Sequence, residues 1–149
     1  NPPTGLNGAV GFSQLVVELV SRARDWMRQA VRDLAHAEAS LRQGDYEWAC
    51  FAAQQAAEKA VKALYESRNM EAWGHSVSRL LEHLPEDLKP APSLLDKAKE
   101  LDRHYIPTRY PNLHSEGAPL DYYTRSDAER AVEQAREVVE FCRSKGVQA

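Results

Sequence analysis

Between residues 46 and 64, apolar and mostly small residues recur every three or four positions. Side chains with this spacing share one face of an α-helix, and small ones let a neighbouring helix approach closely. The face consists of Tyr46, Ala49, Cys50, Ala53, Ala57, Ala60, Val61 and Leu64. The pattern therefore predicts a helix over residues 45–68 that forms the central element of a helical bundle.

Four further segments show the same helical periodicity. They cover residues 22–43, 76–84, 93–105 and 126–145. At the start of the last segment, Ser126 and Glu129 have the residue types and the spacing of a capping box. No stretch alternates between apolar and polar residues for long enough to indicate a β-strand. The sequence therefore predicts an all-α fold, an up-and-down bundle of four to five helices.

The chain has 149 residues, which suits one domain with one hydrophobic core. Its first 12 residues contain two prolines, three glycines and few large apolar side chains. Such composition is typical of a flexible segment. We therefore expect a flexible N-terminal tail over residues 1–20, followed by a helical domain over residues 21–146.

The charge of the chain limits the kinds of partner that it can bind. Nineteen Lys and Arg stand against 22 Asp and Glu, so the formal net charge is −3. A protein that coats nucleic acid without sequence preference usually has an overall positive field, which this chain lacks. Any site for phosphate must therefore be local.

The apolar segments and the cysteines bear on location and on metals. The best candidate for a membrane segment, residues 15–20, is short and is interrupted by Glu18. The first residues lack the pattern of a secretory signal, so we expect a cytoplasmic protein with no membrane association. Cys50 and Cys142 each lie on the apolar face of a predicted helix, which favours buried, reduced thiols. Without a CxxC motif or clustered histidines, the sequence predicts no metal site and no cofactor.

One long irregular segment interrupts the helices. Residues 107–123 contain three prolines, one glycine and three tyrosines. Loops of this length in compact domains are usually either functional or disordered, and a tyrosine-rich composition argues against disorder. Within the loop, Arg109 and His114 are separated by four residues, and Pro111 prevents an α-helix from running between them.

Three segments carry a combination of residues that points to a known family. They are ACFAAQQAAEKAVKALYE (residues 49–66), GHSVSRLL from Gly74, and YIPTRYPNLHSEGAPLDYYTRSDAERA from Tyr105. Together they resemble the HEPN family (higher eukaryotes and prokaryotes nucleotide-binding), in a stand-alone prokaryotic form with an Arg-Tyr-Pro loop. The resemblance covers roughly residues 22–145.

The resemblance implies a fold, partners and a chemistry. It implies a bundle of four to five helices that forms homodimers and is associated with nucleotides or RNA. Some members of the family act beside a separately encoded minimal nucleotidyltransferase as a toxin and antitoxin pair. Many members cleave RNA without a metal, through an arginine followed after four to six residues by a histidine, a spacing that Arg109 and His114 meet.

These residues allow three functional hypotheses. In the first, Arg109 binds nucleotide or RNA phosphate, with Tyr110, His75, Lys59 and Lys62 as further candidate binding residues. The second is a metal-independent endoribonuclease of toxin type, with His114 as the general base and Arg109 stabilising the charged phosphate. The third is a non-catalytic dimeric interaction module.

The candidate site residues other than Tyr110 also have a structural interpretation. Arg109 and His114 can belong to an ordinary proline-rich turn, and His75 can form a hydrogen bond at the entrance of a helix. Lys59 and Lys62 can be solvated lysines.

Overall fold

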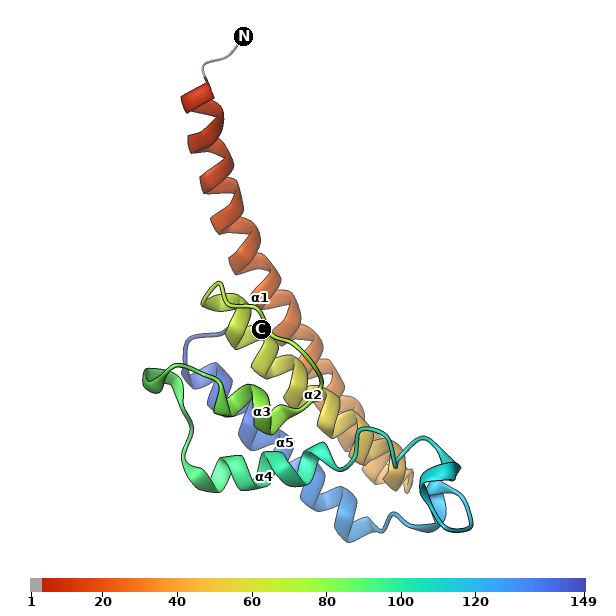
Figure 1. Cartoon of the computed structure of the whole chain (residues 1–149). Helices are drawn as coiled ribbons and strands as arrows, with labels where there is room; N and C mark the ends of the chain where they lie inside the picture. Colours follow the sequence, from red (N-terminus) through yellow and green to blue (C-terminus); the bar gives the residue numbers. More distant parts are fainter. Residues whose placement is uncertain (1–3) are drawn as a thin grey trace.

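The computed structural model describes the backbone of residues 4–149 and the side chains from residue 22 onward (Figure 1). This part of the chain contains helices and turns but no β-strand. The α-helices are α1 (Thr4–Gln43), α2 (Tyr46–Ser67), α3 (Val77–Glu82), α4 (Pro92–Asp102) and α5 (Arg125–Ser144). Three short 3-10 turns, η1 (Glu86–Leu88), η2 (Pro111–Leu113) and η3 (Pro119–Asp121), lie between them. The all-α bundle predicted from periodicity is confirmed.

The predicted helices agree with α2 to α5 to within a few residues. The first helix differs, because α1 begins at Thr4, whereas the periodicity predicted a start near residue 22. Residues 1–3 and the side chains of residues 4–21 lie outside the described part of the chain. The flexible tail expected over residues 1–20 therefore stays a prediction.

Helix α2 is the central element of the bundle, as its small-residue face predicted. It packs along α1 and α5 and also contacts α3 and α4, and Figure 1 shows α1 and α2 running side by side. Ala53, Ala57, Ala60 and Leu64 are fully buried. Small side chains at these positions allow several helices to approach one α2 backbone closely.

The two cysteines are free thiols in this core. Burial raises the pKa of Cys50 to about 12, and the nearby charges of Asp127 and Glu47 act in the same direction. Burial also raises the pKa of the fully buried Cys142. Both side chains therefore stay protonated at neutral pH and act as small core residues, as the sequence predicted.

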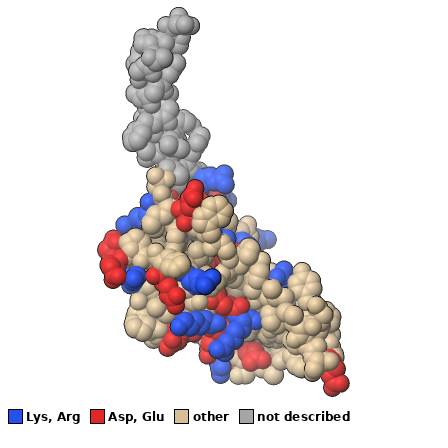
Figure 2. Space-filling view, viewed as in Figure 1, with Lys and Arg blue, Asp and Glu red and all other residues tan. Residues whose placement is uncertain are grey.

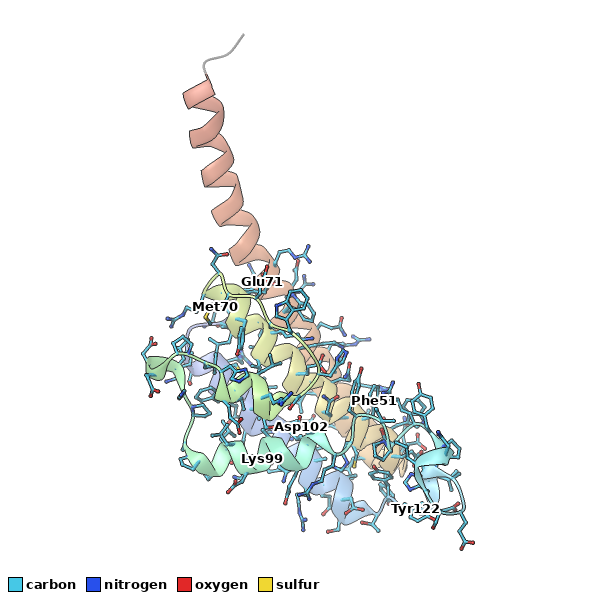
Figure 3. The ribbon with its side chains drawn as sticks, viewed as in Figure 1. Phe51, Met70, Glu71, Lys99, Asp102 and Tyr122 are labelled. Carbon is cyan, nitrogen blue, oxygen red and sulfur yellow. The ribbon has the colours of Figure 1, made fainter. Side chains whose placement is uncertain are left out.

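The start of α3 is tied to the end of α4 by one carboxylate. Asp102 accepts hydrogen bonds from the backbone N–H groups of Val77 (2.6 Å) and Ser78 (3.2 Å). It also accepts from the hydroxyl groups of Ser76 (2.9 Å) and Ser78 (2.5 Å). Asp102 therefore fixes the loop before α3 against the end of α4 (Figure 3).

The capping box of α5 lies two residues before the predicted one. Thr124 accepts a hydrogen bond from the N–H of Asp127 (3.1 Å), and Asp127 accepts one from the N–H of Thr124 (3.0 Å). Glu129, predicted as a capping residue, instead pairs with Arg125 at 2.9 Å. The prediction based on Ser126 was wrong because two overlapping pairs have suitable side chains at the same spacing, and the helix begins at the first.

None of the helices, over the residues described, combines the length and the apolar character needed to cross a bilayer.

Candidate functional site

The loop between α4 and α5 carries Arg109 and His114 at one end of the bundle (Figure 1). The buried Thr108 anchors it by donating a hydrogen bond to the carbonyl of His104 (2.6 Å). Pro111 begins the short turn η2, so no α-helix connects Arg109 to His114. Both residues are loop residues, as the position of Pro111 predicted.

Three aromatic rings surround the guanidinium of Arg109. Its Cζ atom lies 4.3 Å from the ring centroid of Phe51, 4.8 Å from that of Tyr105 and 5.2 Å from that of Tyr110. Its Nε donates a hydrogen bond to the carbonyl of Tyr105 (2.8 Å). We call these four residues the arginine cluster. Arg109 forms no salt bridge with an acidic side chain within the described part of the chain. Its positive charge is therefore stabilised by contacts with aromatic rings and is not neutralised by a carboxylate.

His75 is joined to the arginine cluster through Tyr105. The two rings are stacked, with centroids 4.5 Å apart and planes inclined by 17°. The Nδ1 atom of His75 lies 3.1 Å from Oε1 of Glu58, a carboxylate on α2 whose side chain is 5% exposed. Gln54, on the same helix, donates to the carbonyl of His75 (3.0 Å). Contacts from α2 therefore hold both the ring and the backbone of His75.

The two candidate lysines both have carboxylate partners in the protein. Lys59 pairs with Asp33 of α1. Lys62 pairs with Glu58 at 3.1 Å and lies over the ring of Trp26, 5.8 Å from its centroid. These contacts place both charges in the packing of α1 and α2. A part for Lys59 and Lys62 in nucleotide binding stays a prediction.

His114 belongs to a different part of the loop. Its Nε2 lies 2.8 Å from the carbonyl oxygen of Pro107, and its ring stacks on Tyr122 at a centroid distance of 4.3 Å. Tyr122 in turn donates a hydrogen bond to the carbonyl of Glu116. Tyr122 lies in the loop and Phe51 on α2, at separate places in Figure 3. Among the described contacts, no hydrogen bond joins Arg109 to His114, so their cooperation in catalysis stays a prediction.

Charged side chains are distributed over the helical body. Figure 2 shows Lys and Arg interspersed with Asp and Glu on this face, with few charges at the loop end. Such a surface has no broad positive field. An anion would therefore be attracted by individual groups, of which Arg109 is one.

With this geometry in view, comparisons with known proteins identify the family. The HEPN domain family model matches residues 23–145, which is most of the chain. The chain belongs to the HEPN family. The resemblance seen in its sequence is confirmed.

Solved structures of HEPN proteins and of a further bacterial protein are similar to this one over most of their length. TT1696 from Thermus thermophilus is 52% identical, with a TM-score of 0.81, over 83% of this chain and 98% of that one. ST0689, an archaeal HEPN homologue, is 41% identical, with a TM-score of 0.71, over 83% and 96%. A HEPN domain protein from Thermotoga maritima is 39% identical, with a TM-score of 0.67, over 81% and 96%.

One relative has a name that refers to function. The Methanocaldococcus jannaschii protein "Putative toxin MJ1304" is 28% identical over 130 residues, which cover 81% of this chain and 86% of that protein.

Three residues of α2 that belong to the site were not among the candidates named from the sequence. Phe51 lies outside the small-residue face of α2, and its ring contacts the guanidinium of Arg109. Glu58 and Gln54 also lie outside that face, and both are buried. The available signal was their spacing, because Gln54, Glu58 and Lys62 recur every four residues along α2 and share one face.

Proposed function

We propose that this HEPN protein binds nucleotide or RNA phosphate through Arg109, as a homodimer, and acts in the cytoplasm with a partner protein in a toxin and antitoxin arrangement. The observation that carries the proposal is the unneutralised guanidinium of the arginine cluster. Its Nε donates a hydrogen bond to the carbonyl of Tyr105, while the two terminal nitrogens of the guanidinium form no hydrogen bond within the described part of the chain. Those nitrogens have the geometry for two parallel bonds to a phosphate.

Two features of the loop support binding at this place. The flanking Pro107 and Pro111 restrict the backbone around Arg109, which lowers the entropy lost when an anion is bound. Tyr110 is 48% exposed and already adjoins the guanidinium. Its ring offers a surface on which a base can stack beside the bound phosphate.

The toxin part of the proposal rests on the family and on one relative. The name of the Methanocaldococcus jannaschii protein supports a toxin role. The family resemblance supports a minimal nucleotidyltransferase as the partner protein. A neighbouring gene for such a protein, and growth arrest when the HEPN protein is expressed alone, are the expected observations.

The homodimer is supported by apolar side chains exposed at the loop end. Trp48 is 50% exposed and packs against Phe51 with ring centroids 6.2 Å apart. Ile106 and Leu113 are also exposed on the loop. Where exposed apolar side chains form a continuous patch, they usually mark a contact with another protein. We propose that a second copy of the chain covers them.

A binding assay tests the proposal. A fluorescently labelled single-stranded RNA is titrated with the protein and its anisotropy is followed. Arg109→Ala should weaken binding by about tenfold, equivalent to about 1.4 kcal/mol, because a charge-assisted phosphate contact is lost. Arg143→Ala removes the same charge from the exposed end of α5 and serves as the control. Equal affinities for the wild type and Arg109→Ala would reject the proposal and favour a dimeric interaction module without a ligand.

A second function, metal-independent cleavage of RNA, is favoured by one observation. His114 lies on the loop that carries Arg109, and its ring stacks on Tyr122. His75 contacts the same loop, because its ring stacks on Tyr105. Either ring could accept a proton from a bound ribose, and the pairing expected from sequence spacing favours His114.

A further inference from the structure

We infer that His75, oriented by Glu58, is the proton acceptor of a metal-independent RNA cleavage site whose phosphate ligand is Arg109. This inference rests on the proposed phosphate site and assigns the base to a residue outside the Arg-x4-His spacing. Its basis is the chain of contacts from Glu58 through His75 and Tyr105 to Arg109.

The contact with Glu58 fixes which nitrogen of His75 carries the hydrogen. A carboxylate can only accept, so the 3.1 Å contact requires the hydrogen on Nδ1 of the neutral ring. The lone pair is then on Nε2, which forms no hydrogen bond within the described residues. The side chain of His75 is 54% exposed. Its Nε2 is therefore open to a proton from a ligand.

Glu58 is itself held firmly, which makes it a suitable positioning residue. Its Oε2 accepts from Lys62 (3.1 Å) and its Oε1 accepts from Gln54 (3.3 Å). A buried carboxylate is costly unless it is paired, and these contacts supply the pairing. When His75 gains a proton, the negative charge of Glu58 stabilises the resulting imidazolium.

Tyr105 brings the proton acceptor and the phosphate ligand together. The ring of His75 and the guanidinium of Arg109 both lie against the ring of Tyr105, at 4.5 and 4.8 Å from its centroid. The two groups are thus separated by no more than this one side chain. In the inferred complex, a ribose and its 3′-phosphate contact both groups, with the 2′-hydroxyl toward Nε2 and the phosphate toward the guanidinium.

His114 is less suited to the same task. Its Nε2 is engaged by the backbone carbonyl of Pro107, which carries only a partial negative charge. An imidazolium formed there would lack the full charge that Glu58 provides to His75. Its ring also stacks on Tyr122 and not on a residue of the arginine cluster. The contacts of His114 therefore fit a residue that holds the turn.

The reaction would be an internal transfer of the phosphoryl group. Nε2 of His75 takes the proton of the 2′-hydroxyl, the 2′-oxygen forms a bond to phosphorus, and the bond from phosphorus to the 5′-oxygen breaks. The leaving 5′-oxygen takes a proton from water, and the hydroxide so formed takes the proton from His75. The products are a 2′,3′-cyclic phosphate and a 5′-hydroxyl. Arg109 stabilises the charge that gathers on the phosphate oxygens.

The test compares four proteins purified in the same way. Wild type, His75→Ala, His114→Ala and His83→Ala are incubated with total cellular RNA and EDTA, and the cleavage rate and the ends of the products are measured. His83 is exposed at the opposite end of α3 from His75, so His83→Ala is the neutral control. Loss of a general base should slow cleavage by about 100-fold or more in His75→Ala. His114→Ala should slow it much less.

Further readouts separate chemistry from folding. His75→Ala should lower kcat while RNA affinity and the thermal unfolding midpoint stay near the wild-type values, and added imidazole should restore part of the rate. Glu58→Gln keeps a hydrogen-bond acceptor but removes the charge, so it should also lower kcat more than it changes KM. A His75→Ala protein as active as the wild type would overturn the inference.

The experiments distinguish failure of the His75 inference from failure of the proposed binding function. If the wild type binds RNA through Arg109 but does not cleave it, this inference is overturned and the binding function stands. If cleavage depends on His114 and not on His75, the inference is also overturned. If Arg109→Ala has unchanged affinity, the proposed function itself is rejected.

Discussion

The guanidinium of Arg109 lies over the ring of Phe51, with Cζ 4.3 Å from the ring centroid. This contact joins the loop after α4 to the central helix α2. The position of the Arg109 guanidinium therefore depends on Phe51, a residue that a bound phosphate need not contact. A cation over an aromatic face contributes about 0.5 to 1 kcal/mol at an exposed site and more where water is excluded.

We therefore predict that Phe51→Leu weakens RNA binding several-fold, because it keeps an apolar side chain and removes the π-system. Anisotropy titrations would measure the affinity, and circular dichroism would verify that the helices remain. Cys50→Ala, at the adjacent buried position of α2, is the matched control. Unchanged affinity in Phe51→Leu would show that the ring does not position Arg109.

Leu64 tests the packing of the central helix. Its side chain is fully buried, so Leu64→Ala should lower the free energy of unfolding by about 2 to 5 kcal/mol. Chemical denaturation followed by circular dichroism gives this value. Leu120→Ala, at an exposed position of the loop, should change it by less than about 0.5 kcal/mol. Similar losses in the two variants would contradict the assignment of the core.

His104 should make stability depend on pH. Burial lowers the pKa of His104, although Asp127 and Glu100 act in the opposite direction. Its Nδ1 is buried and forms no hydrogen bond. Below its usual pKa of about 6.5, the unfolded chain takes up a proton that the folded protein takes up only at lower pH. The free energy of unfolding should therefore fall as pH is lowered from about 7 through the folded-state pKa.

The measurement for His104 is a comparison with His104→Gln, which cannot titrate. Denaturation curves at several pH values give the free energy of unfolding of each protein. The wild type should lose more stability than the variant on acidification, because the other titrating groups are common to both. Parallel curves would mean that His104 has the same pKa in both states.

The proposed homodimer predicts a mass of twice the 16.8 kDa of one chain. Light scattering after size exclusion at micromolar concentration measures it. Trp48→Glu should shift the protein toward the monomer, because it places a charge in the exposed apolar surface beside Phe51. Trp73→Glu, at a more exposed tryptophan on the loop between α2 and α3, should not. A wild-type mass of one chain would contradict the dimer.

The sequence predicted the helices better than it predicted the site. The spacing of Ala53, Ala57 and Ala60 depends on the period of one helix, and a local period is readable from a single chain. The same holds for the ends of α2 to α5, to within a few residues. The capping box at Thr124 was missed because Ser126 offers an equivalent pair two residues later, and spacing alone does not choose between them.

The site depends on contacts between segments that are distant in the sequence. His75 meets Glu58 across 17 positions, and Arg109 meets Phe51 of another element. No periodicity in the sequence predicts either contact, because each depends on how a loop folds over α2. Arg109 and His114 are close in sequence, which made them the natural pair to propose. In the structure they contact different rings, Phe51 and Tyr122.

The most direct test of the phosphate site is the salt dependence of RNA affinity in the wild type, Arg109→Ala and Arg143→Ala. A cation that contacts a phosphate of single-stranded RNA contributes about 0.7 to the slope of the logarithm of affinity against the logarithm of salt concentration. We predict that Arg109→Ala reduces this slope by about 0.7 and that Arg143→Ala leaves it unchanged. An Arg109→Ala slope equal to that of the wild type would contradict a phosphate contact at Arg109.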